Sequence, residues 1–465
     1  MTHSSAVTAP RDLVGDALEV PCVDGVARQY VDFDAAASTS ALPVVATRVR
    51  DFLPWYSSVH RGAGYKSRVS TEAYEQAREA ILRFAGRAAD GDDTAIICRN
   101  TTEAINHLAY RLRFDSDDVV VTTVVEHHAN LLPWSRACRR RFVECSADGT
   151  FDVDDVTSAL DAGPLPKLLA ITGASNVTGW MPPIDDIVLA AHERQIPVFL
   201  DAAQLAPHRP VPSSVDFVAW SGHKMYAPFG AGALVGPRRA FADGDPFLAG
   251  GGAVDLVDLD EVIWTDPPER EEAGSPNVLG AIALHEAIDE FERVGWEHIR
   301  SHDTEIGNQL RSGLAAIPGV TLLGPSLTTE TLPLATFTVD GMHHALVAAR
   351  LSAEYGIGVR HGCFCAHPYL ERLLAIPEEQ VRSYREAVLR GDRRAMPGAV
   401  RASASISTTP ADVDRLMEAV GAIAAGSAVA ATYVQDEHTG DFWPDSETAG
   451  WTAGDRSLGA SCARG

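Results

Sequence analysis

The sequence predicts an α/β fold organised on a mostly parallel sheet, with a second, smaller α+β domain toward the carboxyl end. Between Thr94 and Gly236, apolar runs of strand length alternate with amphipathic segments of helix length, which is typical of a parallel sheet with helices on both faces. Several of these runs end in polar side chains, and open α/β sheets carry their chemistry at that edge. At 465 residues the chain is long enough for two domains with substantial cores.

Composition excludes several classes of protein. With 46% hydrophobic and 22% charged residues the chain is an ordinary globular protein, and its formal net charge of -24 argues against nucleic acid or an anionic membrane as a partner. The first residues lack the pattern of a signal peptide, and no apolar stretch reaches membrane-spanning length, so we expect a cytoplasmic protein. Seven scattered cysteines suit reduced thiols. Cys363 and Cys365 form the only close pair, which is a poor zinc site, so we expect no metal.

The first elements read as scaffold. Residues 1–28 are polar and mixed, and we expect a loosely held arm. A short strand and a small-residue turn follow within residues 29–39 (QYVDFDAAAST). Helical spacing then predicts a helix from Ser70, as its cap, to about Ala85, with Gly86 placed to end it.

The next unit has the outline of a phosphate site. An apolar strand, Thr94–Cys98, is followed by Arg99-Asn100 and then by a helix that begins at Thr101-Thr102-Glu103. Free backbone N–H groups, the positive end of the helix dipole and two hydroxyls meet at such a start. Taken alone, Thr-Thr-Glu is more often a simple cap. Its place one β-α unit into the sheet favours the phosphate site.

Two further strands end in polar groups. The β-branched run Val119–Val125 should be buried on both faces and leads into Glu126-His127-His128. A histidine pair that only forms hydrogen bonds at a strand end is an open alternative there. A strand beginning at residues 168–171 leads to Asn176, whose amide would be able to reach a cofactor oxygen or a substrate carboxylate.

The strongest signal lies in the two strands that follow. Residues 196–200 deliver Asp201 and Gln204, and residues 215–220 deliver Ser221, His223 and Lys224. Pyridoxal phosphate needs a lysine amine for its covalent attachment and an acid that keeps its pyridine nitrogen protonated. A carboxylate ending one strand and a Ser-x-His-Lys ending the next therefore indicate a site for this cofactor.

The wording of these stretches, LDAAQ and SGHKMYAPFGAGAL, resembles the class V aminotransferases, and within them the cysteine desulfurases and selenocysteine lyases. The resemblance spans about Tyr30 to Ala424. It implies the pyridoxal-phosphate-dependent transferase fold type I, with a seven-stranded, mostly parallel sheet in a large domain (residues 29–290), a smaller C-terminal α+β domain (residues 291–427) and a homodimer. The Ala-, Gly- and Ser-rich residues 428–465 are predicted to be a disordered tail.

The resemblance also implies roles for individual residues. EHHANLLPW is similar to the desulfurase motif in which the first histidine, here His127, stacks on the cofactor ring. The phosphate would be held by Thr101, Thr102, Ser221 and His223, and by Ser275 of the EAGSPN loop, donated from a neighbouring subunit. Arg401, in Arg-Ala-Ser, matches the binder of the substrate carboxylate, which a guanidinium can clamp with two parallel hydrogen bonds.

A second stretch, GVRHGCFCAHPYL (residues 358–370), resembles the desulfurase pattern Arg-Thr-Gly-x-x-Cys-Ala-x-Pro. It places Cys365 at the position of the sulfur-accepting nucleophile, with Arg360 beside it as a further substrate-binding candidate. Charged neighbours would hold part of the thiol as thiolate. An inert cysteine in a tight turn is the alternative.

Two features depart from the family pattern. His361 stands at the motif's threonine, and Cys363 adds a second thiol that would either resolve a persulfide or signal a different reaction. A charged, helix-prone segment at residues 376–394 is longer than expected, and an added helix there could cover the site.

The resemblance implies a desulfurase that converts L-cysteine to L-alanine. Lys224 would remove the α-proton and Cys365 would receive the sulfur as a persulfide, for transfer to an acceptor such as a protein. A selenocysteine lyase would use the same residues. An aminotransferase, epimerase or other C–S lyase of the class would need Lys224 and Arg401 but not Cys365, and a non-enzymatic scaffold would tolerate loss of Lys224.

Overall fold

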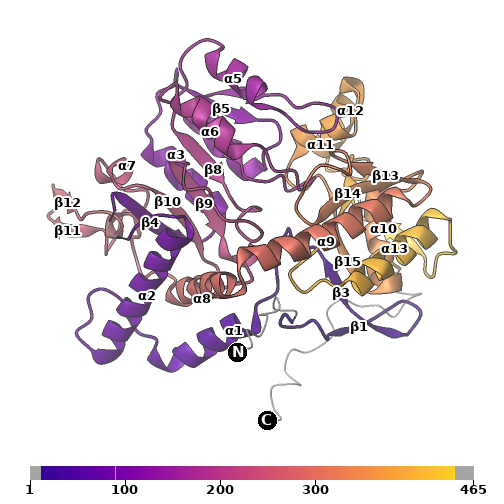
Figure 1. The fold of residues 1–465 in the computed structure, drawn as a ribbon, viewed down its shortest axis with the longest axis horizontal. Coiled ribbons are helices and arrows are strands. Elements are labelled where there is room, and N and C mark those ends of the chain that lie inside the picture. Colours follow the sequence, from indigo (N-terminus) through magenta and orange to yellow (C-terminus); the bar gives the residue numbers. More distant parts are fainter. Residues whose placement is uncertain (1–11, 90, 446–465) are drawn as a thin grey trace, which may run out of the picture.

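The computed structural model describes residues 12–89 and 91–445, which form two lobes, each built on one sheet (Figure 1). The larger lobe contains a seven-stranded sheet in the order β4-β10-β9-β8-β7-β5-β6. Only β10 runs antiparallel to its neighbours, so the predicted mostly parallel, seven-stranded α/β sheet is confirmed. Its strands are β4 (Asp93–Cys98), β5 (Val119–Thr123), β6 (Arg139–Val143), β7 (Leu168–Thr172), β8 (Val198–Asp201), β9 (Phe217–Ser221) and β10 (Gly232–Pro237).

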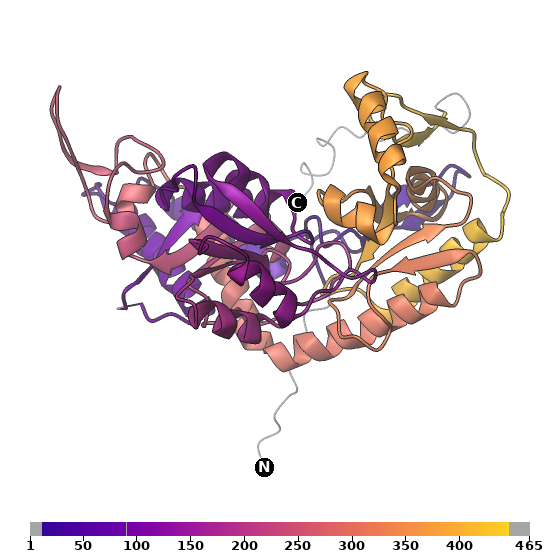
Figure 2. The same ribbon diagram turned by 90° about the horizontal axis from the view of Figure 1, so that it is seen from above.

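Helices cover both faces of this sheet. In the larger lobe they are α1 (Pro43–Phe52), α2 (Tyr65–Phe84), α3 (Thr101–Arg111), α4 (Leu132–Ala137), α5 (Val153–Asp161), α6 (Ile184–His192), α7 (Arg239–Ala242) and α8 (Val278–Val294). A hairpin of β11 (Val254–Val257) and β12 (Val262–Trp264) projects from the lobe in Figure 2. The helices of the smaller lobe are α9 (Trp296–Ala315), α10 (His344–Tyr355), α11 (His367–Leu373), α12 (Glu378–Leu389) and α13 (Pro410–Ala424).

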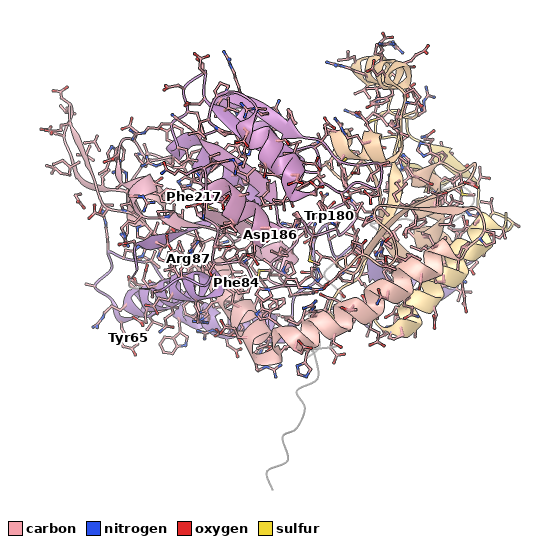
Figure 3. All side chains as sticks on the ribbon, turned by 45° about the horizontal axis from the view of Figure 1, so that its top comes forward. Tyr65, Phe84, Arg87, Trp180, Asp186 and Phe217 are labelled. Atoms are coloured by element: carbon pink, nitrogen blue, oxygen red, sulfur yellow. The ribbon has the colours of Figure 1, made fainter. Side chains whose placement is uncertain are left out.

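Alternation along β8 shows why the sheet is buried on both sides. Val198 and Leu200 pack into the core under α5, α6 and α8, whereas Phe199 points the other way, into the core under α3 and α4. All three are fully buried. In Figure 3, Phe84 and Phe217 lie inside the larger lobe and Tyr65 lies at its rim, in agreement with their burial. Apolar residues on both faces stabilise the sheet, so the polar residues at its strand ends are not needed for the core.

The smaller lobe contains a five-stranded sheet in the order β13-β14-β16-β15-β3. Strands β13 (Val320–Leu323), β14 (Leu334–Val339), β15 (Ile357–Gly362) and β16 (Ala399–Ser403) pair antiparallel, and β3 (Val31–Phe33) joins β15 in parallel. Because β3 comes from the start of the chain, residues 31–33 belong to this sheet and not to the larger one, which differs from the expected domain bound at residue 29.

One expected helix begins earlier than predicted. Helix α2 begins at Tyr65, so Ser70 lies inside it and does not cap it. The Ser70 hydroxyl instead donates to the Trp55 carbonyl and accepts a hydrogen bond from the Ser57 backbone N–H. These hydrogen bonds connect the preceding turn to the helix. A serine in this role and a serine that caps a helix look alike in the sequence.

Both ends of the described chain are more ordered than the composition suggested. Residues 12–28 contain a hairpin of β1 (Glu19–Pro21) and β2 (Ala27–Gln29), held to α10 by a hydrogen bond from the Val23 N–H to the Ala353 carbonyl. Residues 1–11 lie outside the described residues.

The prediction of a disordered tail is wrong for residues 428–445. They contain a second hairpin, of β17 (Tyr433–Gln435) and β18 (Phe442–Pro444), and Figure 2 shows this yellow segment running back toward α12. The Tyr433 hydroxyl donates to Glu354 at 3.1 Å. The stretch is rich in small residues on average, but its few aromatic residues lie in the two strands of the hairpin, and the average composition does not show this. The expected tail from residue 446 onward lies outside the described residues.

Candidate active site

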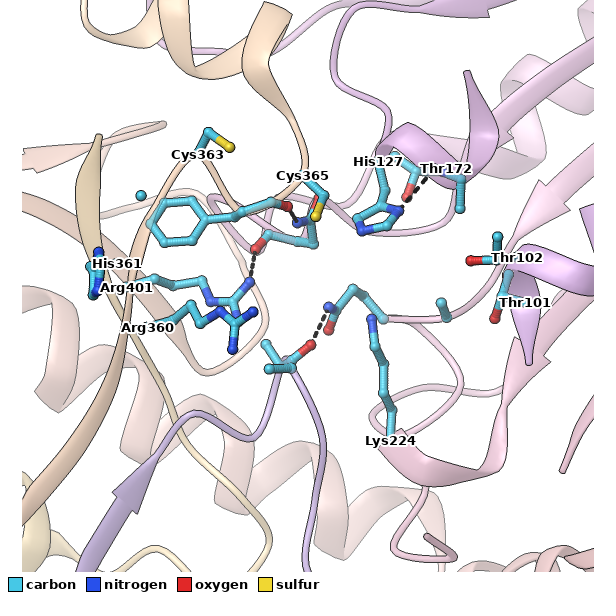
Figure 4. Close-up of a pocket in the computed structure, with 18 of the residues that line it drawn as sticks. Thr101, Thr102, His127, Thr172, Lys224, Arg360, His361, Cys363, Cys365 and Arg401 are labelled. Carbon is cyan, nitrogen blue, oxygen red and sulfur yellow. Dashed lines mark hydrogen bonds between the residues drawn. The ribbon is translucent and has the colours of Figure 1, made fainter. Parts of the chain in front are cut away.

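A cavity of about 480 Å³ lies at the carboxyl ends of the large sheet, facing the smaller lobe. Twelve of the residues singled out from sequence line it: Thr101, Thr102, His127, Asn176, Asp201, Gln204, Ser221, His223, Lys224, Arg360, Cys365 and Arg401. Figure 4 shows Lys224 and His127 between the two threonines on one side and the two arginines on the other. Ser275 does not line this cavity and is exposed on its loop.

One end of the cavity is the start of α3. Asn100 caps this helix by accepting a hydrogen bond from the Glu103 N–H at 3.0 Å. Ser221 accepts from the Thr101 N–H at 2.8 Å, and the two hydroxyls lie 2.7 Å apart. The helix dipole and the hydroxyls therefore converge on a spot suited to an anion such as phosphate.

Lys224 is half-buried at the end of β9, in the middle of the cavity. Burial lowers the pKa of its amine from 10.5 to about 8, with the nearby Arg401 charge acting in the same direction and Asp201 opposing it. A substantial fraction of this amine is therefore neutral close to physiological pH, which a nucleophilic or proton-transferring lysine requires.

Asp201 is buried at the end of β8, where its carboxylate accepts a hydrogen bond from the Ala203 N–H at 3.0 Å. Burial raises the pKa of this carboxyl, while the Ala203 N–H and the Lys224 charge lower it. A cationic partner inside the cavity would stabilise the ionised form. The carboxylate thus fits a protonated ring nitrogen of a cofactor.

His127 is held in one tautomer. Its Nδ1 accepts a hydrogen bond from the Ala129 N–H at 3.0 Å, so the proton of the neutral ring sits on Nε2. Burial, followed by the positive charges of Lys224, His128 and Arg401, lowers the pKa of His127 to about 3. The ring is therefore neutral and apolar enough to lie against an aromatic ring system.

A buried polar network lies behind His127, and sequence reasoning did not identify it. The Glu126 carboxylate accepts hydrogen bonds from the Thr123 hydroxyl, the Thr172 N–H and the Asn130 amide, at 2.8, 3.0 and 2.8 Å. Burial raises the pKa of Glu126 to about 8, although these donors oppose the shift. The network joins the ends of β5 and β7 and holds the backbone that carries His127.

The turn after β3 closes the floor of the cavity. The Gln204 amide donates to the Ala36 carbonyl at 2.8 Å, and the His223 carbonyl accepts from the Thr39 N–H at 2.8 Å. Burial lowers the pKa of His223, and the charge of Lys224 adds to the effect. Residues 36–39 are thereby fastened to the strand ends that bear Gln204 and Lys224.

Cys365 sits on a tightly wound loop between β15 and α11. Phe364 and Cys365 both have left-handed backbone conformations, with φ of 53° and 55°. Non-glycine residues adopt this conformation rarely, and two in succession indicate a strained loop held by its surroundings. The thiol of Cys365 is exposed, whereas Cys363 is half-buried.

Hydrogen bonds from the larger lobe hold this loop. The Phe364 carbonyl accepts from the Asn176 amide at 2.7 Å, and the Cys365 carbonyl accepts from the His128 N–H at 2.8 Å. His128 also stacks on His367, with ring planes 3° apart. In this structure the Asn176 amide therefore positions the cysteine loop, a role that its place at a strand end did not indicate.

Two arginines lie side by side across the paired strands β15 and β16, where Arg360 is in register with Arg401. Arg401 is buried and donates to the Asn176 carbonyl at 2.8 Å and to the Asp34 carboxylate at 3.2 Å. The second oxygen of Asp34 lies 3.6 Å from Arg360, whose side chain is 55% exposed. Burial lowers the pKa of Arg401 to about 10, which leaves it charged at neutral pH.

Three segments of the described chain form the far wall of the cavity, and the sequence placed only the charged segment at residues 376–394 near the site. They are the start of α10, the loop after α12 and the tip of the β17–β18 hairpin. His361 Nε2 lies 3.3 Å from the Asp441 carboxylate at that tip. Helix α12 confirms the expected added helix, and it is the loop after it that reaches the cavity, through Arg393, Met396 and Pro397.

Within the described residues, no helix is long and apolar enough to cross a membrane. The same residues hold no cluster of three or more His, Cys, Asp or Glu side chains arranged for a metal ion. Six cysteines in this part of the chain are unpaired thiols.

Comparison with known proteins agrees with this geometry. The family model "Aminotransferase class-V" matches residues 31–416. A protein of Mycobacterium leprae named "Probable cysteine desulfurase 2" is 32% identical over 431 residues, which cover 88% of this chain and 96% of that protein. A "Cysteine desulfurase" of Dickeya dadantii is 35% identical over 363 residues, covering 75% and 86% of the two chains.

Solved structures show the same likeness. The apo structure of the cysteine desulfurase from Thermococcus onnurineus superposes with a TM-score of 0.75 at 30% identity and covers 85% of this chain and 95% of its own. The cysteine desulfurase CsdA from Escherichia coli gives a TM-score of 0.71 at 30% identity, with 84% and 94% covered. The helix start, the carboxylate, the histidine and the lysine described above fit pyridoxal phosphate, on which this family depends. The chain therefore belongs to the class V aminotransferase family and is a pyridoxal-phosphate-dependent enzyme of fold type I.

Proposed function

We propose that this enzyme is a cysteine desulfurase, which converts L-cysteine to L-alanine and receives the sulfur on Cys365 as a persulfide. The observation that carries the proposal is the position of Cys365. Its exposed thiol lines the same cavity as Lys224 and Arg401, on a strained loop fastened by Asn176 and His128. A cysteine that served only to fill a turn would not need this support.

The chain's own residues divide the work along the cavity. At the phosphate end, Thr101, Thr102, Ser221 and His223 hold the cofactor, together with Ser275 of the partner subunit in a homodimer. His127 would stack on the ring, Asp201 would hold its nitrogen protonated, and Asn176 and Gln204 would border it. When bound, pyridoxal phosphate supplies an electron sink for charge that develops at the substrate α-carbon.

At the substrate end, Arg401 binds the α-carboxylate and Arg360 lies beside it. The Lys224 amine, with its pKa of about 8, takes the α-proton, since a base with a pKa near the working pH transfers protons efficiently. The Cys365 thiolate then attacks the substrate sulfur. A bond forms between the two sulfurs as the carbon–sulfur bond breaks, and its electron pair stays with the carbon, which takes up a proton to become the methyl group of alanine.

The persulfide then passes its outer sulfur to an acceptor thiol, which regenerates the Cys365 thiolate. The acceptor is either a protein or a small thiol. Unpaired thiols at Cys363 and Cys365 suit a reducing compartment such as the cytoplasm.

The test compares Lys224→Ala, Cys365→Ala and Cys363→Ala, with alanine and sulfide measured from L-cysteine. We expect the first two to lose more than about 100-fold in alanine formation, because each removes a group that reacts directly. Cys363→Ala is the matched control, since it removes a thiol from the same loop, and it should retain most activity. Full alanine formation by Cys365→Ala without added thiol would contradict the persulfide mechanism.

His361 and its contact with Asp441 favour a second candidate function, which the same assay tests. A histidine in place of the family's threonine changes the wall beside Cys365. Activity that needs Lys224 and Arg401 but not Cys365 would identify another reaction of the class, such as transamination, epimerisation or C–S lysis. A higher kcat/KM for L-selenocysteine than for L-cysteine would identify a selenocysteine lyase.

A further inference from the structure

The β17–β18 hairpin brings a new wall to the active site. Thr439, Gly440 and Asp441, at the tip of the hairpin, line the cavity. The family match ends at residue 416, so these residues belong to a part of the chain that the family pattern does not describe. Their contacts in the cavity therefore lie outside the matched family pattern.

Hydrogen bonds and close packing hold the hairpin in this position. The Arg393 N–H donates to the Glu437 carbonyl at 2.9 Å, and the Arg393 guanidinium donates to the His438 carbonyl at 2.6 Å. Gly440 approaches the Arg393 carbonyl so closely that an added Cβ would lie 2.8 Å from its oxygen. The Phe442 ring packs 5.5 Å from the ring of His343. The hairpin and the loop after α12 thus form one wall.

The charges at this end of the cavity favour an anion. Burial lowers the pKa of His343 and His361, and that of His344 to about 3, so these three rings are neutral near pH 7. In the part of the chain that the structure describes, the charged groups that line this end are three arginines, Arg360, Arg393 and Arg401, and one aspartate, Asp441. A second aspartate, Asp34, lies beside them at 3.6 Å from Arg360. Asp34 is shared by Arg360 and Arg401, and Asp441 contacts His361.

Of the three arginines at this end of the cavity, Arg393 is the one without a carboxylate partner among the described residues. Within the described residues its guanidinium bonds to the His438 carbonyl and has no carboxylate within 4 Å. Its neighbour Arg394 differs, because it pairs with Asp392 at 2.8 Å and with Glu437 at 3.6 Å and does not line the cavity. Arg393 is exposed where it lines the cavity, so its guanidinium is accessible to an anionic group that enters.

We propose that Arg393 anchors a subsite for the anionic group of a small sulfur compound that enters this cavity. Two sources share this chemistry. One is an amino-acid substrate whose sulfur carries an acidic substituent, and the other is a small acidic thiol that accepts sulfur from Cys365. In the second case, which rests on the proposed function, the thiolate attacks the outer sulfur of the persulfide, a new sulfur–sulfur bond forms on the acceptor, and Cys365 leaves as thiolate.

The experiment has two arms, each with an acid and its uncharged amide. In the acceptor arm, the holoenzyme turns over L-cysteine with 3-mercaptopropionate or 3-mercaptopropionamide as the thiol. In the substrate arm, S-carboxymethyl-L-cysteine and S-carbamoylmethyl-L-cysteine are compared as ligands by the change in absorbance of the bound cofactor. The variants are Arg393→Gln, Arg393→Lys and, as the matched control, Arg394→Gln.

We expect the wild-type enzyme to prefer the acid over the amide by about tenfold in at least one arm, as a charge-assisted hydrogen bond would give. Arg393→Gln should abolish this ratio, Arg393→Lys should keep part of it, and Arg394→Gln should leave it unchanged. A preference in the acceptor arm identifies the acceptor, and one in the substrate arm identifies the substrate.

Equal use of acid and amide in both arms, or a preference that survives Arg393→Gln, would overturn the proposal. The substrate arm needs no turnover. Failure to release sulfur from L-cysteine with any thiol would therefore count against the desulfurase function, while the binding ratio would still decide the subsite.

Discussion

The Asp34 carboxylate accepts a hydrogen bond at 3.2 Å from the buried Arg401, the side chain that we propose binds the substrate carboxylate. Its other oxygen lies 3.6 Å from Arg360. Asp34 would thus compete with a substrate carboxylate for these arginines, and it reduces their positive charge.

Asp34→Asn should therefore tighten the binding of amino acids. Removing the carboxylate leaves two arginines without a competing anion, and we expect KM for L-cysteine to fall by up to about tenfold, the scale of a charged hydrogen bond. Steady-state kinetics would measure it, with Asp24→Asn, a surface aspartate paired with Arg28, as the control. An increase in KM would show instead that Asp34 mainly positions Arg401.

Attachment of the cofactor should depend on pH through Lys224. Because the pKa of this amine is lowered from 10.5 to about 8, the neutral, reactive form predominates above pH 8, whereas an ordinary lysine needs a more alkaline solution. We expect the rate of covalent attachment of pyridoxal phosphate to the cofactor-free protein to rise with pH and level off above about pH 8. Borohydride reduction followed by mass spectrometry would locate the adduct. Lys167→Ala, which removes a surface lysine, should leave it unchanged, and Lys224→Ala should abolish it.

The edge of the large sheet could be predicted from sequence because its residues follow strand ends directly. His127, Asp201 and Lys224 each come just after a buried apolar run, and parallel topology brings such ends to one edge. The start of helix α8 also follows from a local signal, because the Asn277 side chain caps it by accepting a hydrogen bond from the Gly280 N–H. Local pattern is sufficient where the chain itself places the residue.

The remaining site residues depend on contacts between distant segments. Asp441 reaches His361 only because a hairpin beyond the small lobe folds back, and no pattern near either residue indicates the pairing. Asp34 was visible in the sequence, but an aspartate before a small-residue turn has a common local explanation as a turn residue. In the sequence, Glu126 is only the first residue of a Glu-His-His motif. Its role in a buried hydrogen-bond network depends on Thr172 and Asn130, which the fold brings to it.

Glu126 should make stability depend on pH. Burial raises its pKa from 4.5 in the unfolded chain to about 8 in the folded protein, so the folded state binds more protons between these values. This contribution is therefore fully present below about pH 4.5 and is lost as pH rises through 8. Glu126→Gln should remove this dependence, which denaturant unfolding of wild type and variant at pH 6 and pH 8.5 would reveal as a difference in slope.

The same variant should also lower stability at every pH. All three partners of Glu126 donate hydrogen bonds to it, so a glutamine N–H₂ would face one of these donors. A buried mismatch of this kind costs about 1–3 kcal/mol. Equal stability of the variant and the wild type would show that the network is able to rearrange.

Gly232 should be required for the phosphate end of the site. A Cβ at this position of β10 would lie 2.7 Å from the Trp220 carbonyl oxygen and 2.9 Å from the Asn100 Cα, both of them backbone atoms that cannot turn away. Gly232→Ala should therefore push Asn100 and the start of α3 out of place. We expect about 1–3 kcal/mol of destabilisation, the usual cost of overpacking, together with weaker binding of pyridoxal phosphate.

Gly421→Ala is the matched control, because that glycine lies within α13 with open space around its Cβ position and should gain up to about 1 kcal/mol from helix propensity. Urea unfolding and cofactor titration of both variants would measure the two effects, and unchanged cofactor affinity in Gly232→Ala would show that the start of α3 does not bind the phosphate.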